Sequence, residues 1–441
     1  MAITDTRSRQ SAAFDPTGRS FRFVVLFVAS LLTYGSYFAY DSVGAIPDQL
    51  MKRWDVDQTA IGALYSVYSL AAIVTLLFGG MIIDRFGTRK ASLAFSTLVT
   101  LGACLVALAP GIEVAYVGRF LFGAGSESLI TAQNAIWARW FRGKELALAF
   151  GVSITISRLG TLFSFNTEAL VAERYGPAIA LWAAALFCAL SVLANLIYKV
   201  LDRKGESVLG LGNGGTSERI VLADIRRFPV SYWYVTFLCL AFYSAIFPFT
   251  ALSTDFFAQK WGLPSASGEG LGFFHAVFFN FLNMFSTAPG TSSIIIFASL
   301  IFAPIAGSFV DSAGRRVSLM LFGSLLMIPA HLMLGFTTLP PAIPMVILGA
   351  AFVMVPASLW ASIPLIVAKE RVGTAFGLLT MIQNVGLMVF PWINGKLRVY
   401  TQSYTASMLM FATLGLLAFA LSLVLYQVDR REGRVLQKRS A

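Results

Sequence analysis

Long apolar segments, separated by short polar or basic loops, run through most of the 441-residue chain. Each segment reaches about 20 residues, the length that an α-helix needs to cross the hydrocarbon core of a bilayer. Barrel strands would instead alternate apolar and polar residues over about ten positions. The pattern therefore predicts an all-α polytopic membrane protein. The twelve predicted spans are 22–47, 58–83, 90–110, 114–141, 145–171, 177–200, 230–260, 287–311, 316–337, 341–368, 372–396 and 402–428.

The composition supports this class of protein and excludes several others. Hydrophobic residues make up 57% of the chain and charged residues only 12%, about half of what soluble domains carry. The net charge of +11 resides in loops between spans, which argues against a nucleic-acid partner. The three cysteines and two histidines have no metal or disulfide spacing, so we expect no metal and no cofactor. No nucleophile stands beside a base, so an enzyme is not expected.

Basic residues gather in the loops on one side of the predicted membrane. With both termini cytoplasmic, most of the Lys and Arg residues fall in cytoplasmic segments, as the positive-inside rule requires. The chain contains no Asn-x-Ser/Thr sequon and no evident cleavable signal. These features predict a bacterial inner-membrane protein with cytoplasmic termini. The opposite loops hold only Lys52, Arg53, Arg174, Lys260, Lys396 and Arg398.

A repeat divides the chain into two halves. A glycine-rich basic motif after the second span recurs after the eighth at an offset of 227 residues, and Ala149-Phe150-Gly151 recurs as Ala375-Phe376-Gly377 at an offset of 226. We predict six-helix bundles at 1–200 and 230–441, a cytoplasmic linker at 201–229, and a substrate site between the bundles at mid-depth. The first motif contains Gly80, Asp84, Arg85, Gly87 and Arg89, and the second contains Gly307, Asp311, Gly314, Arg315 and Arg316.

Glu127 and Arg158 are the two ionisable residues that carry the functional prediction. They lie 16 residues before and 15 residues after Gly143, in the loop between two spans. At about 1.5 Å per residue both lie roughly 23 Å from that loop, near the bilayer midplane. Charge at this depth costs at least a few kcal/mol and marks a functional site by default. The alternative is a salt bridge that merely braces two helices.

Several motifs resemble a known family. The loop from Gly80 to Lys90 resembles the signature that the major facilitator superfamily carries between its second and third helices, and Arg119-x-x-x-Gly123-x-Gly125 resembles its fourth-helix motif. A narrower resemblance, to the family of lysosomal dipeptide transporters called major facilitator superfamily domain-containing protein 1, covers both halves. The segment 264–289 is longer than in that family. The resemblance is carried by residues 35–38, 118–123, 133–134, 140–141, 143–151, 157–160, 373–377 and 382–387.

The resemblance implies a carrier that moves dipeptides by alternating access. It also implies that Glu127 contacts the amino terminus of the peptide and Arg158 its carboxyl terminus. The charged ends of a dipeptide lie roughly 5–7 Å apart, at about 3.5 Å per extended residue, which suits groups on neighbouring helices. The expected partners are a dipeptide and the lipid bilayer. We expect a monomer, and the sequence shows no counterpart of the accessory subunit that mammalian members need.

Aromatic and amide side chains near mid-depth are further candidates for the substrate site. Tyr34 and Tyr37 share a helix face, and Asn134 lies two turns from Glu127, whereas Gln133 is expected to pack between helices. Ordinary packing or an interfacial aromatic belt is the alternative for these tyrosines. The complete set of added candidates is Tyr34, Tyr37, Asn134, Tyr243, Trp360, Gln383 and Asn384, the last being the repeat mate of Arg158.

The two repeated motifs predict a conformational latch, not a substrate contact. Asp84 can lie at the N-terminus of a neighbouring helix, where a carboxylate is favoured, while the arginines pair with acids of the opposite face. This latch is expected to hold the outward-open state, through Gly80, Asp84, Arg85, Gly87, Arg89, Asp311, Arg315 and Arg316. Arg119 is expected to donate to neighbouring carbonyls; a role in proton transfer is the alternative.

Two other functions remain open from the sequence. A proton-coupled symporter would bind a small organic anion or an amino acid at Arg158 and a proton at Glu127. A receptor or scaffold with a transporter fold is a third possibility, although such a protein has little use for a charged pair at mid-membrane. A dipeptide uniporter is the leading interpretation.

Overall fold

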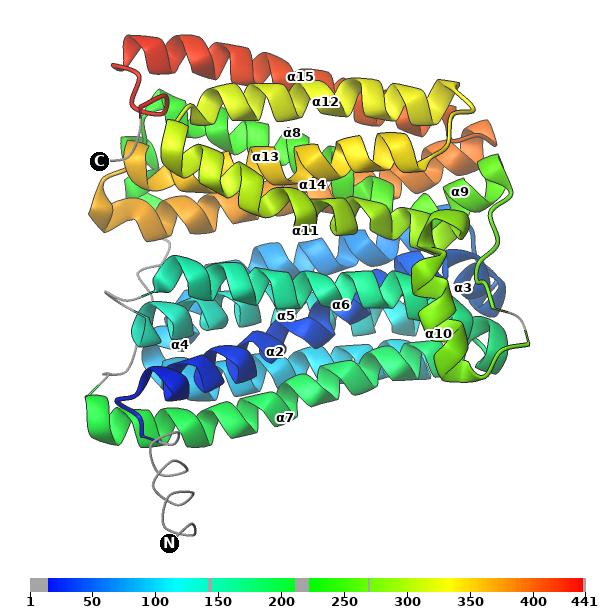
Figure 1. The fold of residues 1–441 in the computed structure, drawn as a ribbon, viewed down its shortest axis with the longest axis horizontal. Coiled ribbons are helices and arrows are strands. Elements are labelled where there is room, and N and C mark those ends of the chain that lie inside the picture. Colours follow the sequence, from blue (N-terminus) through cyan, green and yellow to red (C-terminus); the bar gives the residue numbers. More distant parts are fainter. Residues whose placement is uncertain (1–14, 142–144, 211–221, 269, 439–441) are drawn as a thin grey trace, which may run out of the picture.

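The computed structural model describes residues 15–141, 145–210, 222–268 and 270–438. Two bundles of long helices lie side by side with their axes roughly along one direction (Figure 1). The first half contains α2 (Arg19–Ala45), α4 (Gln58–Leu108), α5 (Ile112–Trp140), α6 (Leu146–Tyr175) and α7 (Pro177–Leu209). The second contains α8 (Val230–Thr250), α11 (Ala288–Ala313), α12 (Arg316–Phe336), α13 (Ala342–Ile366), α14 (Val372–Thr401) and α15 (Thr405–Arg431).

The twelve predicted spans are confirmed, although one long helix carries two of them. Ten helices in the described residues are long and apolar enough to cross a membrane. Of these, α4 has 51 residues and bends at Gly87, whose φ of 76° favours glycine, so it supplies two crossings. The remaining span is α5, which is less apolar because it contains Arg119 and Glu127. Gly314, the repeat mate of Gly87, also has a positive φ, of 70°.

Short helices connect the long ones at the ends of the bundle. Three are α-helical: α3 (Pro47–Trp54), α9 (Ser253–Trp261) and α10 (Phe273–Leu282). The 3-10 helices are η1 (Leu222–Arg227), η2 (Met284–Ser286) and η3 (Lys369–Arg371).

Two boundaries differ from the prediction. The span predicted at 230–260 is wrong as one helix: α8 ends at Thr250 and α9 begins at Ser253. Pro248 lacks a backbone N–H and so removes a helical hydrogen bond just before the break. Helix α7 continues to Leu209, so the predicted start of the linker lies inside a helix. The domain limits themselves stay a prediction.

The two halves meet at one end of the bundle. Helix α2 begins and α15 ends at the same end, here called the terminal end, and the opposite end is called the far end (Figure 1). At the far end α4 and α14 approach closely: a Cβ on Gly62 would lie 2.2 Å from the Pro391 carbonyl oxygen, and one on Gly395 would lie 2.3 Å from that of Gln58. Toward the terminal end, Gly151 of α6 and Gly307 of α11 have no described atom within 4 Å of a Cβ position. The two halves are therefore in close backbone contact at the far end.

Candidate functional site

Glu127 lies near the middle of the 29-residue helix α5. The hydroxyl of Tyr68 on α4 donates a hydrogen bond of 3.0 Å to its Oε1 atom. The side chain of Glu127 is only partly covered by protein, although the residues on either side of it are buried. A carboxylate at this depth would be costly against lipid, so its accessible surface must face the interior of the bundle.

Arg158 lies near the middle of the 30-residue helix α6 and contacts the second half. Its Nη1 atom donates to the Ser299 hydroxyl on α11 at 3.2 Å. Its guanidinium lies 4.3 Å from the centroid of the Phe352 ring on α13, a cation–π distance. Arg158 is also only partly covered. This residue therefore joins the two halves through contacts with uncharged side chains.

Tyr37 is an electrostatic neighbour of both charged residues, Arg158 and Glu127. Arg158 in turn interacts with Tyr37, with Tyr243 of the second half and with Asp41 of α2. Among the described residues no ion pair within 4.0 Å joins Glu127 to Arg158. In this conformation the two charges share a neighbour but do not pair with each other. A bracing salt bridge would require that they pair directly.

The other candidates of the first half are divided between the site and the helix packing. The ring of Tyr34 packs edge-on against Phe187 of α7, at 5.7 Å between centroids, and the residue stays partly exposed. Asn134 is partly exposed on α5, two turns beyond Glu127. Gln133 is buried and donates to the Ala29 carbonyl at 2.7 Å, which places it between α5 and α2 as expected.

In the second half, two candidates form a hydrogen-bonded pair. The Trp360 indole donates to the Tyr243 hydroxyl at 3.1 Å, and this hydroxyl belongs to the residue that interacts with Arg158. Gln383 is partly exposed and accepts a weak 3.6 Å contact from Cys239. Asn384 is buried, with its amide nitrogen on the Thr380 carbonyl at 3.0 Å and its oxygen without a hydrogen-bond partner among the described residues.

Arg119 acts as a donor to backbone carbonyls, the first of its two predicted roles. It is 2% exposed and donates to the carbonyls of Ala39 and Tyr40 on α2, at 3.3 and 3.1 Å. Nearby on the same helix, Asp41 accepts a hydrogen bond of 2.7 Å from Thr161 of α6. These contacts tie α2 to α5 and α6, the helices that carry Glu127 and Arg158.

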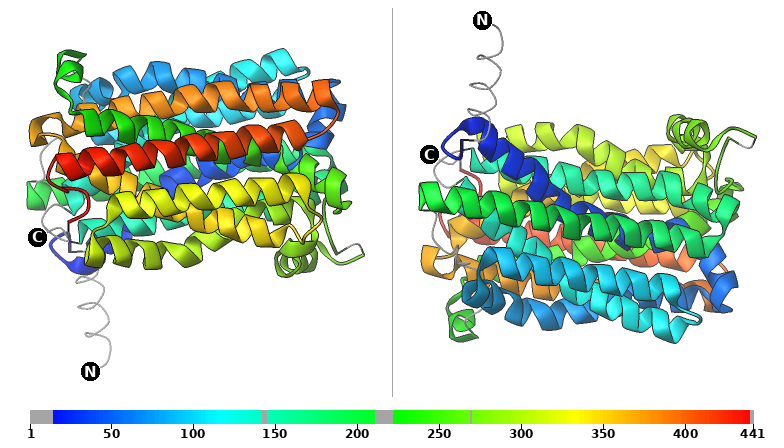
Figure 2. Two further views of the ribbon diagram at one scale, coloured as in Figure 1. Left: turned by 90° about the horizontal axis from the view of Figure 1, so that it is seen from above. Right: turned by 90° about the horizontal axis from the view of Figure 1, so that it is seen from below.

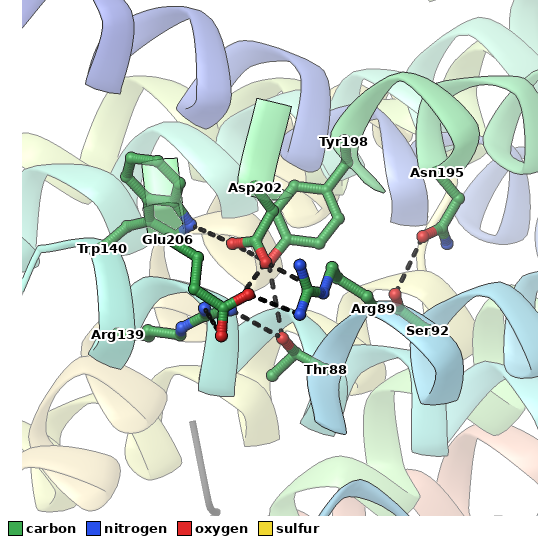
Figure 3. A network of polar contacts seen from close by, with 9 residues as sticks. All are labelled: Thr88, Arg89, Ser92, Arg139, Trp140, Asn195, Tyr198, Asp202 and Glu206. Atoms are coloured by element: carbon green, nitrogen blue, oxygen red, sulfur yellow. Dashed lines mark hydrogen bonds and ion pairs between the residues drawn. The ribbon is translucent and has the colours of Figure 1, made fainter. Parts of the chain in front are cut away.

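The motif arginines have partners within their own halves. Arg89 pairs with Asp202 and Glu206 of α7 at 3.4 and 2.5 Å, and Arg139 of α5 pairs with Asp202 at 2.7 Å (Figure 3). Arg85 lies 5.4 Å from the Phe86 ring. In the second half, Arg316 donates to the Lys438 carbonyl at 3.0 Å, and the Arg315 N–H donates to that of Gln437 at 3.3 Å. The side chain of Asp311 lies outside the described residues.

The far end is closed by a polar cluster around the buried carboxylate of Asp255 on α9. Its oxygens accept from Gln58 of α4 at 3.3 Å, from Gln259 at 2.5 Å, and from the Tyr404 hydroxyl. Burial and the neighbouring charge of Asp255 raise the pKa of Asp48, on α3 outside the spans, to about 7. Gln58 and Asp48 belong to the first half, so this cluster crosses the seam between the halves.

Three residues that hold the charged groups were not found from the sequence: Tyr68, Ser299 and Phe352. Tyr68 lies in a predicted span that also contains Tyr65, and a pair of tyrosines deep in an apolar helix is a signal that could have been used. Ser299 and Phe352 give no such signal, because buried serines are common here and the chain contains 38 phenylalanines.

Comparisons with known proteins agree with this architecture. The sequence pattern of the Major Facilitator Superfamily matches residues 26–296 and 282–441. The chain is 32% identical to Lysosomal dipeptide transporter MFSD1 of Homo sapiens, over 96% of this chain and 89% of that protein. It is 33% identical to that of Danio rerio, over 87% and 82% of the two chains. A more distant relative is the Probable sulfoacetate transporter SauU of Cupriavidus necator, 23% identical over 90% of this chain and 93% of that protein.

Solved structures show the same fold. The peptide transporter POT in complex with sulfate superposes with a TM-score of 0.68 and 15% identity, over 94% of this chain and 96% of that one. The nucleoside transporter NupG superposes with a TM-score of 0.66 and 15% identity, over 91% and 99%. The pattern match, the relatives and the helix arrangement lead to one conclusion: the chain belongs to the major facilitator superfamily, as an integral multi-pass membrane transporter close to the MFSD1 proteins.

Proposed function

We propose that this protein carries dipeptides across a bacterial inner membrane by alternating access, as a uniporter with both termini in the cytoplasm. Glu127 and Arg158 carry the proposal. They lie at mid-helix on α5 and α6, remain partly accessible, and share Tyr37 as a neighbour without pairing with each other. The 32% identity to relatives named lysosomal dipeptide transporters supports the substrate class.

A zwitterion suits this arrangement of charges. Each protein charge is now held by an uncharged partner, Tyr68 for Glu127 and Ser299 for Arg158. A dipeptide brings one ammonium and one carboxylate, so each buried charge would gain an opposite charge at the moment of binding. The substrate has no net charge, so its transport requires no accompanying ion. This balance favours uniport.

The conformation seen in the structure fits one state of such a cycle. The halves are in close contact at the far end, and open space adjoins Gly151 and Gly307 near the terminal end. With cytoplasmic termini this arrangement would fit an inward-open state, in which Arg89 pairs within its own half. The proposed latch across the halves would then form only in the outward-open state.

A proton-coupled carrier of a small organic anion is the second candidate function. The relative named Probable sulfoacetate transporter favours it, because a sulfonate or carboxylate would suit Arg158 alone. In that case Glu127, already bonded to the Tyr68 hydroxyl, would take up the proton.

Uptake into liposomes that contain the purified protein tests both functions. A dipeptide uniporter exchanges labelled dipeptide against unlabelled dipeptide inside the vesicle, and a protonophore leaves the uptake rate unchanged. Collapse of concentrative uptake by the protonophore would favour the symporter. Exchange of an organic anion with no exchange of dipeptides would reject the proposed substrate.

A further inference from the structure

Helix α10 differs from every long helix in its direction. It belongs to the long connection between α9 and α11 and runs across the axes of the long helices, at the far end of the bundle (Figure 1). Seen from above and below, it lies at the edge of the bundle (Figure 2). Since the long helices follow the membrane normal, the axis of α10 lies roughly in the membrane plane.

One face of α10 fixes it to the first half. Asn280 is 1% exposed; its amide donates to the Asn166 carbonyl on α6 at 3.0 Å, and its oxygen accepts from the Ser267 N–H at 2.8 Å. The Phe281 ring, at the side of the helix between Asn280 and Phe274, lies 4.9 Å from that of Phe163 on α6. The helix is therefore held in a defined orientation against the first half, although it belongs to the second half in sequence.

The opposite face of α10 is apolar and uncovered. Phe274, Phe278 and Leu282 follow one another at a spacing of four residues, which places them on one side of the helix. Their exposed fractions are 83%, 65% and 64%. No Asp, Glu, Lys or Arg occurs from residue 270 to residue 310. An exposed apolar patch of this kind marks an interaction surface.

The depth of α10 identifies the bilayer as the partner. Helix α6, with 30 residues, is about 45 Å long and exceeds a hydrocarbon core of about 30 Å by roughly 7 Å at each end. Asn166, the contact of Asn280, lies nine residues or about 14 Å before Tyr175 at the end of α6, hence roughly 6 Å inside the core boundary. Interfacial helices bury their apolar face about 5–10 Å into this boundary. Phe163 of α6, which lies against Phe281, is itself 40% exposed and extends the apolar surface beside α10.

We propose that α10 is an interfacial helix whose face Phe274–Phe278–Leu282 binds the lipids of the leaflet at the far end. It lies across the seam between α6 and α11, so the bilayer itself holds this connection against the first half. The proposal is independent of the transported substrate.

The proposal is tested in full-length protein in phosphatidylcholine–phosphatidylglycerol liposomes. The measurement is the collision rate of a nitroxide spin label with oxygen, compared with its collision rate with a water-soluble nickel chelate. Labels are placed by Phe274→Cys, Phe278→Cys and, as a control in the polar loop after α14, Gln402→Cys. The three native cysteines are first replaced by alanine, and melting temperature and elution volume confirm that each variant is folded. A variant that fails this check is replaced by Leu282→Cys on the same face.

Lipid contact predicts more collisions with oxygen than with the chelate at the α10 positions, and the reverse order at the control. More collisions with the chelate at the α10 positions would show a water-exposed face and overturn the proposal. Exclusion of both reagents, with dipolar coupling between labels of two molecules, would identify a second copy of the chain as the occupant and also overturn it.

Discussion

Replacing Glu127 with glutamine removes one charge and little else. The amide oxygen of glutamine can still accept the hydrogen bond that Tyr68 now donates at 3.0 Å. Glu127 forms no ion pair with another described residue, so the variant should leave no opposite charge unpaired. The melting temperature of the protein should therefore stay close to that of the wild type.

Binding of a free dipeptide should weaken in this variant because its ammonium loses a charged acceptor. A hydrogen bond to a charged group contributes about 1.5–3 kcal/mol. At about 1.4 kcal/mol per factor of ten, this corresponds to a roughly 10- to 150-fold loss of affinity. An N-acetylated dipeptide has no ammonium, so Glu127→Gln should bind it no worse than the wild type does.

Arg158 provides the complementary test at the carboxyl terminus. Arg158→Ala should no longer discriminate a dipeptide from its C-terminal amide, and its affinity for the free dipeptide should fall by about 2–5 kcal/mol. Arg158→Lys should recover only part of this, because an ammonium cannot hold a carboxylate through two parallel hydrogen bonds. The cation–π contact with Phe352 would persist only partly.

Thermal stabilisation by ligands measures these affinities, because a ligand at a hundredfold its dissociation constant adds about 2.7 kcal/mol to the free energy of unfolding. Competition for uptake of a labelled dipeptide gives an independent value. If both variants bind free, acetylated and amidated dipeptides in the wild-type ratio, the assignment of both residues is wrong. If instead both lose melting temperature without changing that ratio, the bracing role is the correct one.

Four further predictions concern the rest of the molecule. Asp84→Asn should shift the population toward the terminal-end-open state, which labelling of cysteines from both sides of the membrane measures; unchanged labelling rejects the latch. Lengthening the chain within residues 211–216 should leave ligand-induced stabilisation intact, and its loss would place the linker in the site. Asp202→Ala leaves Arg89 and Arg139 without a buried partner, so the free energy of unfolding should fall by about 3–5 kcal/mol, with Glu206→Ala, at a less buried acid, as the milder control. Closure raises the pKa of Asp48 from 3.8 to about 7. The charged and titratable groups around Asp48 are Asp255, Lys52, Tyr404 and Arg398. Far-end closure should therefore be strongest in acid and weaken as the pH rises from about 4 to about 7. Asp48→Asn should flatten that dependence in the same labelling assay.

The helices could be predicted from the sequence because the bilayer imposes their length and polarity. Even α5, whose charges lower its hydropathy, was identified through its position between two clear spans. The repeat was visible for a similar physical reason: a positive φ favours glycine, and Gly87 and Gly314 have positive φ at equivalent positions of the two halves.

The breaks between helices were less predictable. The sequence from Val230 to Leu252 is largely apolar, and within it only Pro248 indicates that one helix ends and another begins. The segment that contains α10 is apolar too, but at ten residues it is too short to span, and hydropathy alone does not distinguish an interfacial helix from a buried one.

Glu127 and Arg158 could be located from the sequence because a charge in a membrane helix is conspicuous, whereas their partners could not. Tyr68, Ser299 and Phe352 are uncharged residues on three other helices, and their contacts depend on how those helices are rotated and packed. The prediction that Tyr34 and Tyr37 line the site together depended on helix periodicity alone and stays a prediction. The contact of Tyr34 with Phe187 of α7 could not be read from the sequence, because it depends on how α2 and α7 pack.

The distribution of charge between the halves suggests which half holds the substrate during transport. The acidic and basic residues that lie inside the spans and away from the helix ends, Arg119, Glu127 and Arg158, all belong to the first half. The second half offers Arg158 only a hydroxyl, an aromatic ring and the tyrosine Tyr243. Breaking a hydrogen bond between uncharged groups costs about 1 kcal/mol, whereas leaving a buried charge without its partner costs about 2–5 kcal/mol. We therefore expect a dipeptide bound to Glu127 and Arg158 to stay with the first half while the second half moves away from it and closes again.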